Sequence, residues 1–396
     1  MKKLKIVVGG YVGLFPMGGA AWDYVQYPLG LHLLGHDVYY IEDTQRYPTF
    51  QAPGKDWTDA TDSVEHLKRT MENFGLASKW AYRDIGSGIC YGMQLSKVLE
   101  VCKNADVFIN ISCSTFLRDE YLAIPNRILI DSDPMFTQVQ YYNEVNGNAN
   151  DRKTDMRSII EKHNYLFTFG ENIGAEDCLI PLLGFTWHPT RQPICLDQWV
   201  NNIIPHNKYF SSVLNWCERP KLFFNNQSWG QKNVEFMKFI KIPCMSQGTE
   251  FQMLIKRKPV EGEVQFEEKQ LVDEGWKVYD PHDYITSASA YREFILHAYA
   301  EFSIAKETYV KSNSGWFSCR SACYLAAGKP VVAQDTCWSR TIPAGTGLFS
   351  FNTIEEAIQG IKEVEKNYAH HSKAAIDIAN EYFDSNKVLA DILAIL

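Results

Sequence analysis

Two glycine-containing segments carry residue types that bind anions. In the first, GGYVGLFPMGGAAWD, the pair Gly18 and Gly19 directly precedes a pattern typical of a helix. Backbone N–H groups at a helix N-terminus bind anions, and glycine lets the backbone approach them closely. The spacing differs from the G-x-G-x-x-G dinucleotide fingerprint, so an ordinary loop is the competing interpretation.

The second segment, YVKSNSGWFSCRSACYLAAGKPVVAQDT, places a polar loop before another helical pattern. Free N–H groups in this loop, at Ser314, Gly315 and Trp316, predict a second phosphate-type site. Arg320 lies near the first helical turn, where the helix dipole disfavours a cation unless an anion is close by. That anion is either a bound phosphate or a carboxylate of the chain itself.

The elements that position these residues alternate between strands and helices. Buried parallel strands are indicated by LKIVVGG, HDVYYIED, ADVFINIS and NRILIDSDP, and a helix by AAWDYVQYPLGLHLLG, in which Pro28 predicts a kink or a break. The same alternation restarts at KLFFNNQSWG, after an aperiodic stretch rich in proline and tryptophan. The pattern predicts an α/β fold with two open parallel sheets and right-handed crossovers.

Chain length supports a division into two domains, because 396 residues exceed one ordinary core. We predict a first domain over residues 1–195, a linker over 196–212 and a second domain over 213–375. A C-terminal helix is predicted over residues 376–396.

Composition and charge narrow the class of protein. The chain is 45% hydrophobic and 22% charged, and its formal net charge is −8, which gives no general attraction to nucleic acid or anionic lipid. The sequence has no signal-peptide pattern at its start and no apolar run of membrane-spanning length, and its ten cysteines form no C-x-x-C pair. These features predict a cytoplasmic protein with reduced cysteines and no metal site.

Two segments taken together resemble nucleotide-sugar glycosyltransferases of the GT-B fold, bacterial and phage proteins of the family 1 type. PMGGAAWDYVQYPLGLHLLGHDV is similar to their P-x-G-G, helix, L-x-x-x-G-H-x-V pattern, and YLAAGKPVVAQDTCWSRTIPAGTGLFSF to their donor-domain segment A-x-G-x-P-V-V-A. The resemblance implies two Rossmann-like domains facing across a cleft, with the acceptor in the first and the donor in the second. It also implies a C-terminal helix that crosses back to the first domain.

The resemblance implies a donor site as well, with one departure. Relatives that retain the sugar's configuration carry two glutamates where this chain has Gly315 and Cys323, which puts the usual grip on a UDP-sugar in doubt. Asp335 or Glu307 would replace one of those contacts. Lys232 and Lys306 are expected to supply positive charge to the phosphates, and the alternative role of such a lysine is a solvated surface side chain. The donor-binding residues predicted in full are Gly18, Gly19, Lys232, Lys306, Ser314, Gly315, Trp316, Arg320, Asp335 and Thr336.

Glycosyl transfer with inversion needs a base for the acceptor hydroxyl. By resemblance the leading candidate is Asp23, although an acidic residue there also stabilises the helix start. Asp133 is the second candidate base. Residues predicted to bind the acceptor are Asp131, Glu171 and Asn172, and the competing interpretation of the DSDP segment is an ordinary turn.

The expected function is transfer of a sugar from a nucleoside diphosphate donor, a UDP-sugar above others, to a hydroxyl acceptor, by inversion and without a metal. No cofactor beyond this co-substrate is expected, and the acceptor is a glycan or another small molecule. Three alternatives are open: a nucleotide-sugar epimerase on the same fold, a nucleotide-binding protein that has lost catalysis, and a glycosyltransferase acting on hydroxylated bases in DNA.

Overall fold

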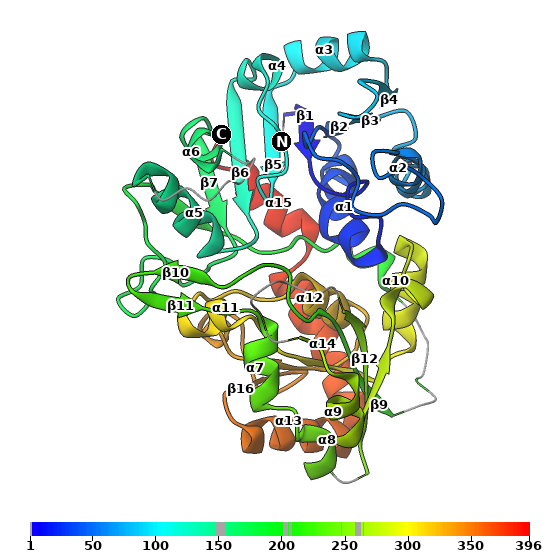
Figure 1. Ribbon diagram of the computed structural model, residues 1–396, viewed down its shortest axis with the longest axis vertical. Helices are drawn as coiled ribbons and strands as arrows, with labels where there is room; N and C mark the ends of the chain where they lie inside the picture. The colour runs from blue at the N-terminus through cyan, green and yellow to red at the C-terminus, as the bar shows by residue number, and fades with distance from the viewer. Residues whose placement is uncertain are drawn as a thin grey trace.

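The computed structural model describes residues 2–147, 155–200, 205, 208–246, 248–257, 263 and 265–396. Each half of the chain is built on its own sheet, and the two halves, here called the first and second domains, lie one above the other in Figure 1. None of the helices in these described ranges has the length and apolarity that a membrane span requires.

The first domain is an eight-stranded sheet of order β4-β3-β2-β1-β5-β6-β7-β8, parallel except where β4 joins β3. Its central strands are buried on both faces, which accounts for their continuous apolar sequences. The strands are β1 (Lys5–Gly9), β2 (Asp37–Glu42), β3 (Trp80–Arg83), β4 (Cys90–Gly92), β5 (Val107–Ile111), β6 (Asn126–Asp131), β7 (Tyr165–Thr168) and β8 (Trp187–Pro189). The helices are α1 (Gly18–Leu33), α2 (Thr61–Asn73), α3 (Leu95–Lys103), α4 (Asp119–Leu122), α5 (Phe136–Val145) and α6 (Met156–Glu161).

The second domain is a six-stranded parallel sheet of order β13-β12-β9-β14-β15-β16, with a separate antiparallel hairpin. The sheet strands are β9 (Tyr209–Asn215), β12 (Glu250–Lys256), β13 (Trp276–Tyr279), β14 (Ala300–Ser303), β15 (Val331–Gln334) and β16 (Leu348–Phe351), and the hairpin strands are β10 (Leu222–Phe224) and β11 (Gln227–Trp229). The helices are α7 (Lys232–Lys238), α8 (Ile242–Met245), α9 (Glu268–Asp273), α10 (Ala288–His297), α11 (Glu307–Lys311), α12 (Cys319–Ala326), α13 (Ile354–Lys366), α14 (Tyr368–Tyr382) and α15 (Ser385–Leu393).

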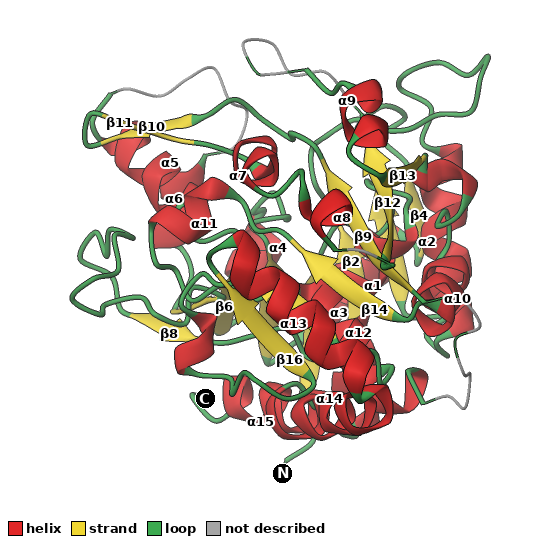
Figure 2. Cartoon of the chain, turned by 90° about the horizontal axis from the view of Figure 1, so that it is seen from below, coloured by secondary structure: helices red, strands yellow, loops and turns green. Residues whose placement is uncertain are grey.

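The C-terminal helices join the two domains. Helix α14 packs on α12 of the second domain, and α15 packs on α1 of the first. Figure 1 shows α15 beside α1, and Figure 2 shows α14 and α15 along one side of the molecule. One hydrophobic cluster extends through both domains and includes Trp22 of α1, Ile295 of α10, Tyr324 of α12 and Leu389 of α15. The predicted return of the C-terminal helix to the first domain is therefore confirmed.

Local structure departs from the sequence-based expectation in three places. Helix α1 continues through Pro28 without a break, because its packing on α10 and α15 holds the backbone helical. Strand β12 was not predicted, and β9 begins inside the segment predicted as a linker. The serines of β9 made it look like a loop, but Ser211 bonds the Tyr324 hydroxyl (2.8 Å) and Ser212 the Phe302 carbonyl. Part of that predicted linker, residues 201–204 and 206–207, lies outside the described residues.

Candidate active site

The loops at the carboxyl ends of the two sheets meet at the domain interface, which is where ligands bind in open α/β sheets. Trp316 of the second domain donates its indole N–H to the Ser132 carbonyl of the first (3.1 Å). The Asn172 N–H donates to the Ser314 carbonyl (3.1 Å) in the same interface. Most of the predicted site residues of the two halves are thus gathered along one interface.

The glycine-rich loop after β1 already holds an anion, which is the carboxylate of Glu42. The N–H groups of Gly13 and Leu14 donate to its two oxygens (2.8 and 2.6 Å), and the Tyr40 hydroxyl adds a third bond (3.0 Å). Burial raises the pKa of Glu42 to about 7. These N–H groups therefore stabilise the fold by binding Glu42, and they are not available to a ligand phosphate while that contact is made.

Gly18 and Gly19 pack against α10 of the second domain. The Gly18 N–H donates to the Ile285 carbonyl (2.9 Å), and a Cβ at this position would lie 2.5 Å from the Cβ of Tyr291 and closer still to the Ser287 carbonyl. At Gly19 the nearest atom would be 3.3 Å away, on the Tyr291 ring. Close approach of protein backbone explains the glycine at position 18, so the structure gives no sign that its N–H meets a phosphate.

We expect Gly18→Ala to weaken the docking of the two domains. The added methyl group collides with backbone, so the free energy of unfolding should fall by about 1–3 kcal/mol, measured by urea denaturation. Gly19→Ala is the matched control, because the Tyr291 ring can yield and alanine favours a helix. Equal stability of the two variants would show that position 18 tolerates a side chain and that its glycine has another purpose.

The loop Ser314–Trp316 is also bonded within the chain. The Gly315 N–H donates to the Thr336 carbonyl (2.6 Å), and the Trp316 N–H donates to the Ser314 hydroxyl (3.2 Å). Gly315 has a φ of 74°, and a Cβ there would lie 2.6 Å from the Asn172 nitrogen. The N–H groups predicted to bind a diphosphate are therefore occupied, and this loop docks onto the first domain.

Gly315 and Cys323, the two positions at which the resemblance led us to expect glutamates, both face the first domain. The buried Cys323 thiol accepts a hydrogen bond from the Gln26 amide of α1 (3.7 Å). Asp335, considered as a substitute, binds the hydroxyl of Ser339 (2.6 Å). The other substitute, Glu307, accepts from the Gly230 N–H (2.7 Å).

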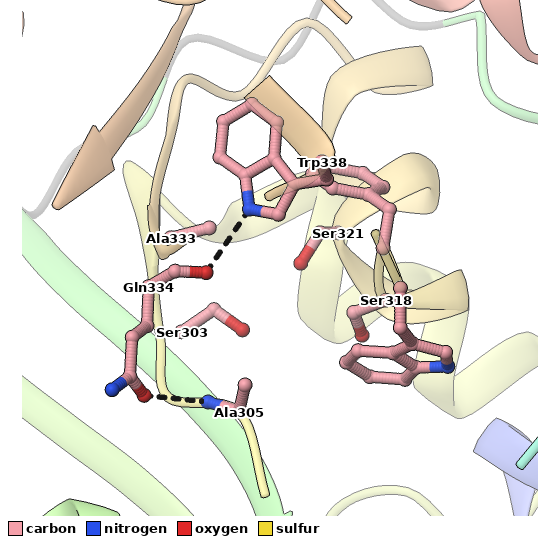
Figure 3. A pocket seen from close by; sticks show the side chains of 9 residues that line it. Ser303, Ala305, Ser318, Ser321, Ala333, Gln334 and Trp338 are labelled. Atoms are coloured by element: carbon pink, nitrogen blue, oxygen red, sulfur yellow. Dashed lines mark hydrogen bonds between the residues drawn. The ribbon is translucent and has the colours of Figure 1, made fainter. Parts of the chain in front are cut away.

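A small pocket lies one turn further along, at the N-terminus of α12 (Figure 3). Its walls come from β14, β15, α12 with the segment before it, and the loops after β14 and β15. The hydroxyls of Ser303 and Ser321 face the hollow. The Ser321 hydroxyl is fully buried and has no hydrogen-bond partner in the part of the chain that the structure describes. The first-turn N–H groups of α12 have no acceptor within the helix, so this turn is better suited to an anion than the preceding loop.

Arg320 has the local partner that the sequence left open. Its guanidinium binds the buried carboxylate of Glu301, the Val213 carbonyl and the hydroxyl of Ser303 (2.8 Å). These bonds fix the start of α12 to the sheet, and they explain a cation at a helix N-terminus.

The residues predicted to bind the acceptor are engaged in structural contacts. Asp131 is buried, and it accepts from Thr137 (2.6 Å), Gln138 (2.8 Å) and Thr168 (2.9 Å). Glu171 pairs with Arg191. Asn172 bonds the Asn313 carbonyl (2.8 Å) and accepts from Arg340 (3.2 Å) across the interface. None of these groups needs a ligand to satisfy it.

Among the charged residues predicted for the site, Asp23 and Lys232 have environments that suit chemistry. Burial raises the pKa of Asp23 to about 7, against the opposing effect of Arg320. Burial, with Arg320 and Lys306 nearby, lowers the pKa of Lys232 to about 7. Within the described residues neither the Asp23 carboxylate nor the Lys232 ammonium has a hydrogen bond or close ion pair. A carboxylate and an amine that both titrate near neutral pH, each acting on the other's charge, are typical of a catalytic site.

Asp133, the second candidate base, is bound by three side chains of the second domain. Lys306 Nζ lies 2.8 Å from one carboxylate oxygen, Arg219 Nη2 lies 3.2 Å from the other, and the Tyr309 hydroxyl also donates. Burial opposes ionisation, but the two cations lower the pKa of Asp133 below its usual value. A carboxylate held ionised by three donors is a weak proton acceptor.

Sequence reasoning missed Arg219 and Tyr309, and it also missed Glu218, which lies 3.0 Å from Lys306 Nζ. A signal was present for Glu218 and Arg219, which belong to the charged segment CERPK that begins two residues after β9, at the ligand edge of the sheet. It was overlooked because β9 itself was taken as linker.

Comparison with known proteins identifies the fold. No family model and no curated protein matches the sequence. Among solved structures, the chain is similar to an alpha-glucosyltransferase in complex with UDP and a DNA 13-mer containing an HMU base (TM-score 0.60, 11% identity, 100% of this chain and 99% of that chain). It is also similar to sucrose-phosphate synthase from Thermosynechococcus elongatus (0.51, 10%, 99% and 98%) and to a glycosyltransferase from Rickettsia africae (0.51, 11%, 100% and 98%). The chain has the GT-B fold over its whole length.

Proposed function

We propose that this protein transfers a sugar from a nucleoside diphosphate donor to a hydroxyl group, with Asp23 as the general base. The observation that carries the proposal is the Asp23 carboxylate itself. It lies at the domain interface with a pKa raised to about 7 by burial, and no bond to another described side chain restrains it. A base that titrates near the working pH is the most effective one.

The donor is proposed to lie against the second domain. Its diphosphate would face Lys232 and the first turn of α12, where the Ser321 hydroxyl is buried and unpartnered in the described chain. Gln231 and Asn233, on either side of Lys232, also have buried amide groups without partners among the described residues. Buried polar groups are normally satisfied, so a polar ligand at the start of α7 accounts for them.

The chemical step follows from these positions. The acceptor hydroxyl gives its proton to Asp23 as its oxygen bonds to the anomeric carbon of the donor sugar. The bond from that carbon to the phosphate oxygen breaks, and its electron pair leaves with the nucleoside diphosphate. Lys232 and the α12 N–H groups would stabilise that negative charge. Attack on the face opposite the leaving group inverts the configuration, and charge stabilisation by these groups gives the reaction a route without a metal.

The test begins with a thermal-shift screen against UDP, GDP, ADP, TDP and CMP and their sugars, since a ligand of the folded state raises Tm. The stabilising sugar nucleotide is then incubated with hydroxyl acceptors, among them glycans, small molecules and DNA carrying hydroxymethylated bases, with and without EDTA. The expected result is acceptor-dependent release of the nucleoside diphosphate and an inverted glycoside, unchanged by EDTA. A donor changed at its own sugar without acceptor would establish an epimerase, and binding without turnover would establish a nucleotide-binding protein.

A further inference from the structure

The loop that follows β6 brings one carboxylate of the first domain into a cationic cluster of the second. Asp133 binds Lys306 (2.8 Å), Arg219 (3.2 Å) and the Tyr309 hydroxyl. Phe136, three residues further on, lies under both cations, with Arg219 Cζ 4.7 Å and Lys306 Nζ 5.0 Å from its ring centroid. One segment of the first domain, from Asp133 to Phe136, thus contacts both cations.

Without Asp133, the cluster would present a net positive charge and a hydroxyl donor toward the first domain. Lys306 keeps Glu218 as a partner at 3.0 Å, so Lys306, Arg219 and Glu218 together carry one net positive charge, and Tyr309 adds a hydroxyl donor. All four residues belong to the second domain. The Asp133 side chain is 33% exposed, so solvent and small ions reach the place where its carboxylate sits.

We propose that Asp133 occupies, in the empty and closed protein, the place of a phosphate group of the donor, which must displace it to bind. The inference rests on the proposed function, because it takes the anion to be the diphosphate of a nucleotide. A carboxylate and a phosphate both present anionic oxygens to Lys, Arg and Tyr donors, so the same three side chains serve either one. Asp133 then keeps the domains closed until a donor arrives.

The backbone beside Asp133 supports release of this loop. Met135 is a non-glycine residue with φ 71° and ψ −45°, a conformation that costs free energy and is kept only by surrounding contacts. The Met135 N–H donates to the Gln138 side-chain oxygen (2.7 Å) inside the first domain, and the flanking residues Asp133 and Ser132 bond to the second domain. Loss of the Asp133 contacts removes part of what holds the loop in place.

The variant Asp133→Asn tests the proposal, because asparagine keeps the shape and removes the charge. Binding of UDP and of inorganic pyrophosphate is measured by calorimetry, and the radius of gyration of the ligand-free protein by small-angle X-ray scattering. We expect about tenfold tighter binding of both probes, since the competing closed state is less populated, and a larger radius that decreases when UDP is added.

Asp177→Asn is the matched control. Asp177 pairs with Arg340 across the same interface (2.9 and 2.6 Å), and the two side chains are 44% and 48% exposed. Its loss loosens the interface without freeing the cationic cluster, so affinity for both probes should stay within about twofold of the wild type.

The outcomes separate this proposal from the proposed function. Unchanged or weaker pyrophosphate binding by Asp133→Asn overturns the proposal, even if the wild type binds UDP and turns over. Tighter pyrophosphate binding by the variant of a protein that binds no nucleotide at all upholds the anion site and removes the nucleotide donor. A protein that binds neither probe in either form contradicts both.

Discussion

Replacement of Asp23 by asparagine lowers turnover by a factor of about 100 to 10,000, the usual contribution of a general base, and leaves the affinity for the nucleoside diphosphate nearly unchanged. Asparagine keeps the size of the side chain but cannot take the acceptor proton. The measurement is steady-state kinetics with the donor and acceptor found in the screen, together with calorimetric binding of the nucleoside diphosphate. Asp37→Asn is the control for a general loss of carboxylate charge, because Asp37 begins β2 and so lies at the amino ends of the strands, away from the ligand side of the sheet.

The pH dependence gives Asp23 a second, independent signature. Because its pKa is raised to about 7, kcat/KM of the wild type should fall tenfold for each pH unit below about 7. In the same window the folded protein binds more protons than the unfolded chain, where the group has its usual pKa of 3.8. Stability therefore decreases as the pH rises from about 4 to 7. Asp23→Asn should have a higher Tm than the wild type at pH 8, and the difference should vanish near pH 4.

Turnover retained in Asp23→Asn, with the acid limb of the pH profile in place, would remove Asp23 as the base. A retaining mechanism, which needs no such base, would then gain support. Lost turnover accompanied by a lower Tm would instead indicate that Asp23 supports the fold.

The sequence predicted the α/β alternation because it depends on local apolar patterns, whereas the return of the C-terminal helix was expected only from the resemblance to a known fold. Patterns of this kind are visible when a strand is a run of Val, Ile and Leu, as β1, β5 and β6 are. They fail for β9, whose serines are satisfied by partners on β14 and α12. A strand of that type is recognised only once its tertiary partners are known.

The candidate site was less accessible to sequence reasoning, because a polar residue at a strand end has two competing uses. Asp131 and Asp133 are separated by one residue, yet the first is satisfied inside its own domain and the second across the interface. Gly18 suggested phosphate, but the close backbone at Ser287 explains it, and the N–H of Gly13 in the same loop binds the carboxylate of Glu42. Asp23 differs from them because its carboxylate has no hydrogen-bond or ion-pair partner among the described residues. That difference is visible only in the folded chain.

Replacement of Lys232 by methionine weakens binding of the nucleoside diphosphate by about 10- to 100-fold, since a hydrogen bond to a charged group contributes about 1.5–3 kcal/mol. Methionine keeps the apolar stem and removes the ammonium. Lys238→Met is the control, because Lys238 lies on the same helix but is 55% exposed and paired with Glu235 (2.6 Å). Affinity in the control should equal that of the wild type.

Proton uptake makes this prediction specific to Lys232, which is half-buried. The pKa of Lys232 is lowered to about 7, so at pH 8 the amine is mostly neutral, and a bound diphosphate raises that pKa and draws in a proton. Calorimetry in buffers of different ionisation enthalpy should therefore show uptake approaching one proton in Asp23→Asn, where the neighbouring carboxylate that titrates near pH 7 is absent. The uptake should disappear in the double variant with Lys232→Met. Uptake that persists there would mean that a group other than Lys232 takes up the proton, which would contradict the placement of the diphosphate against Lys232.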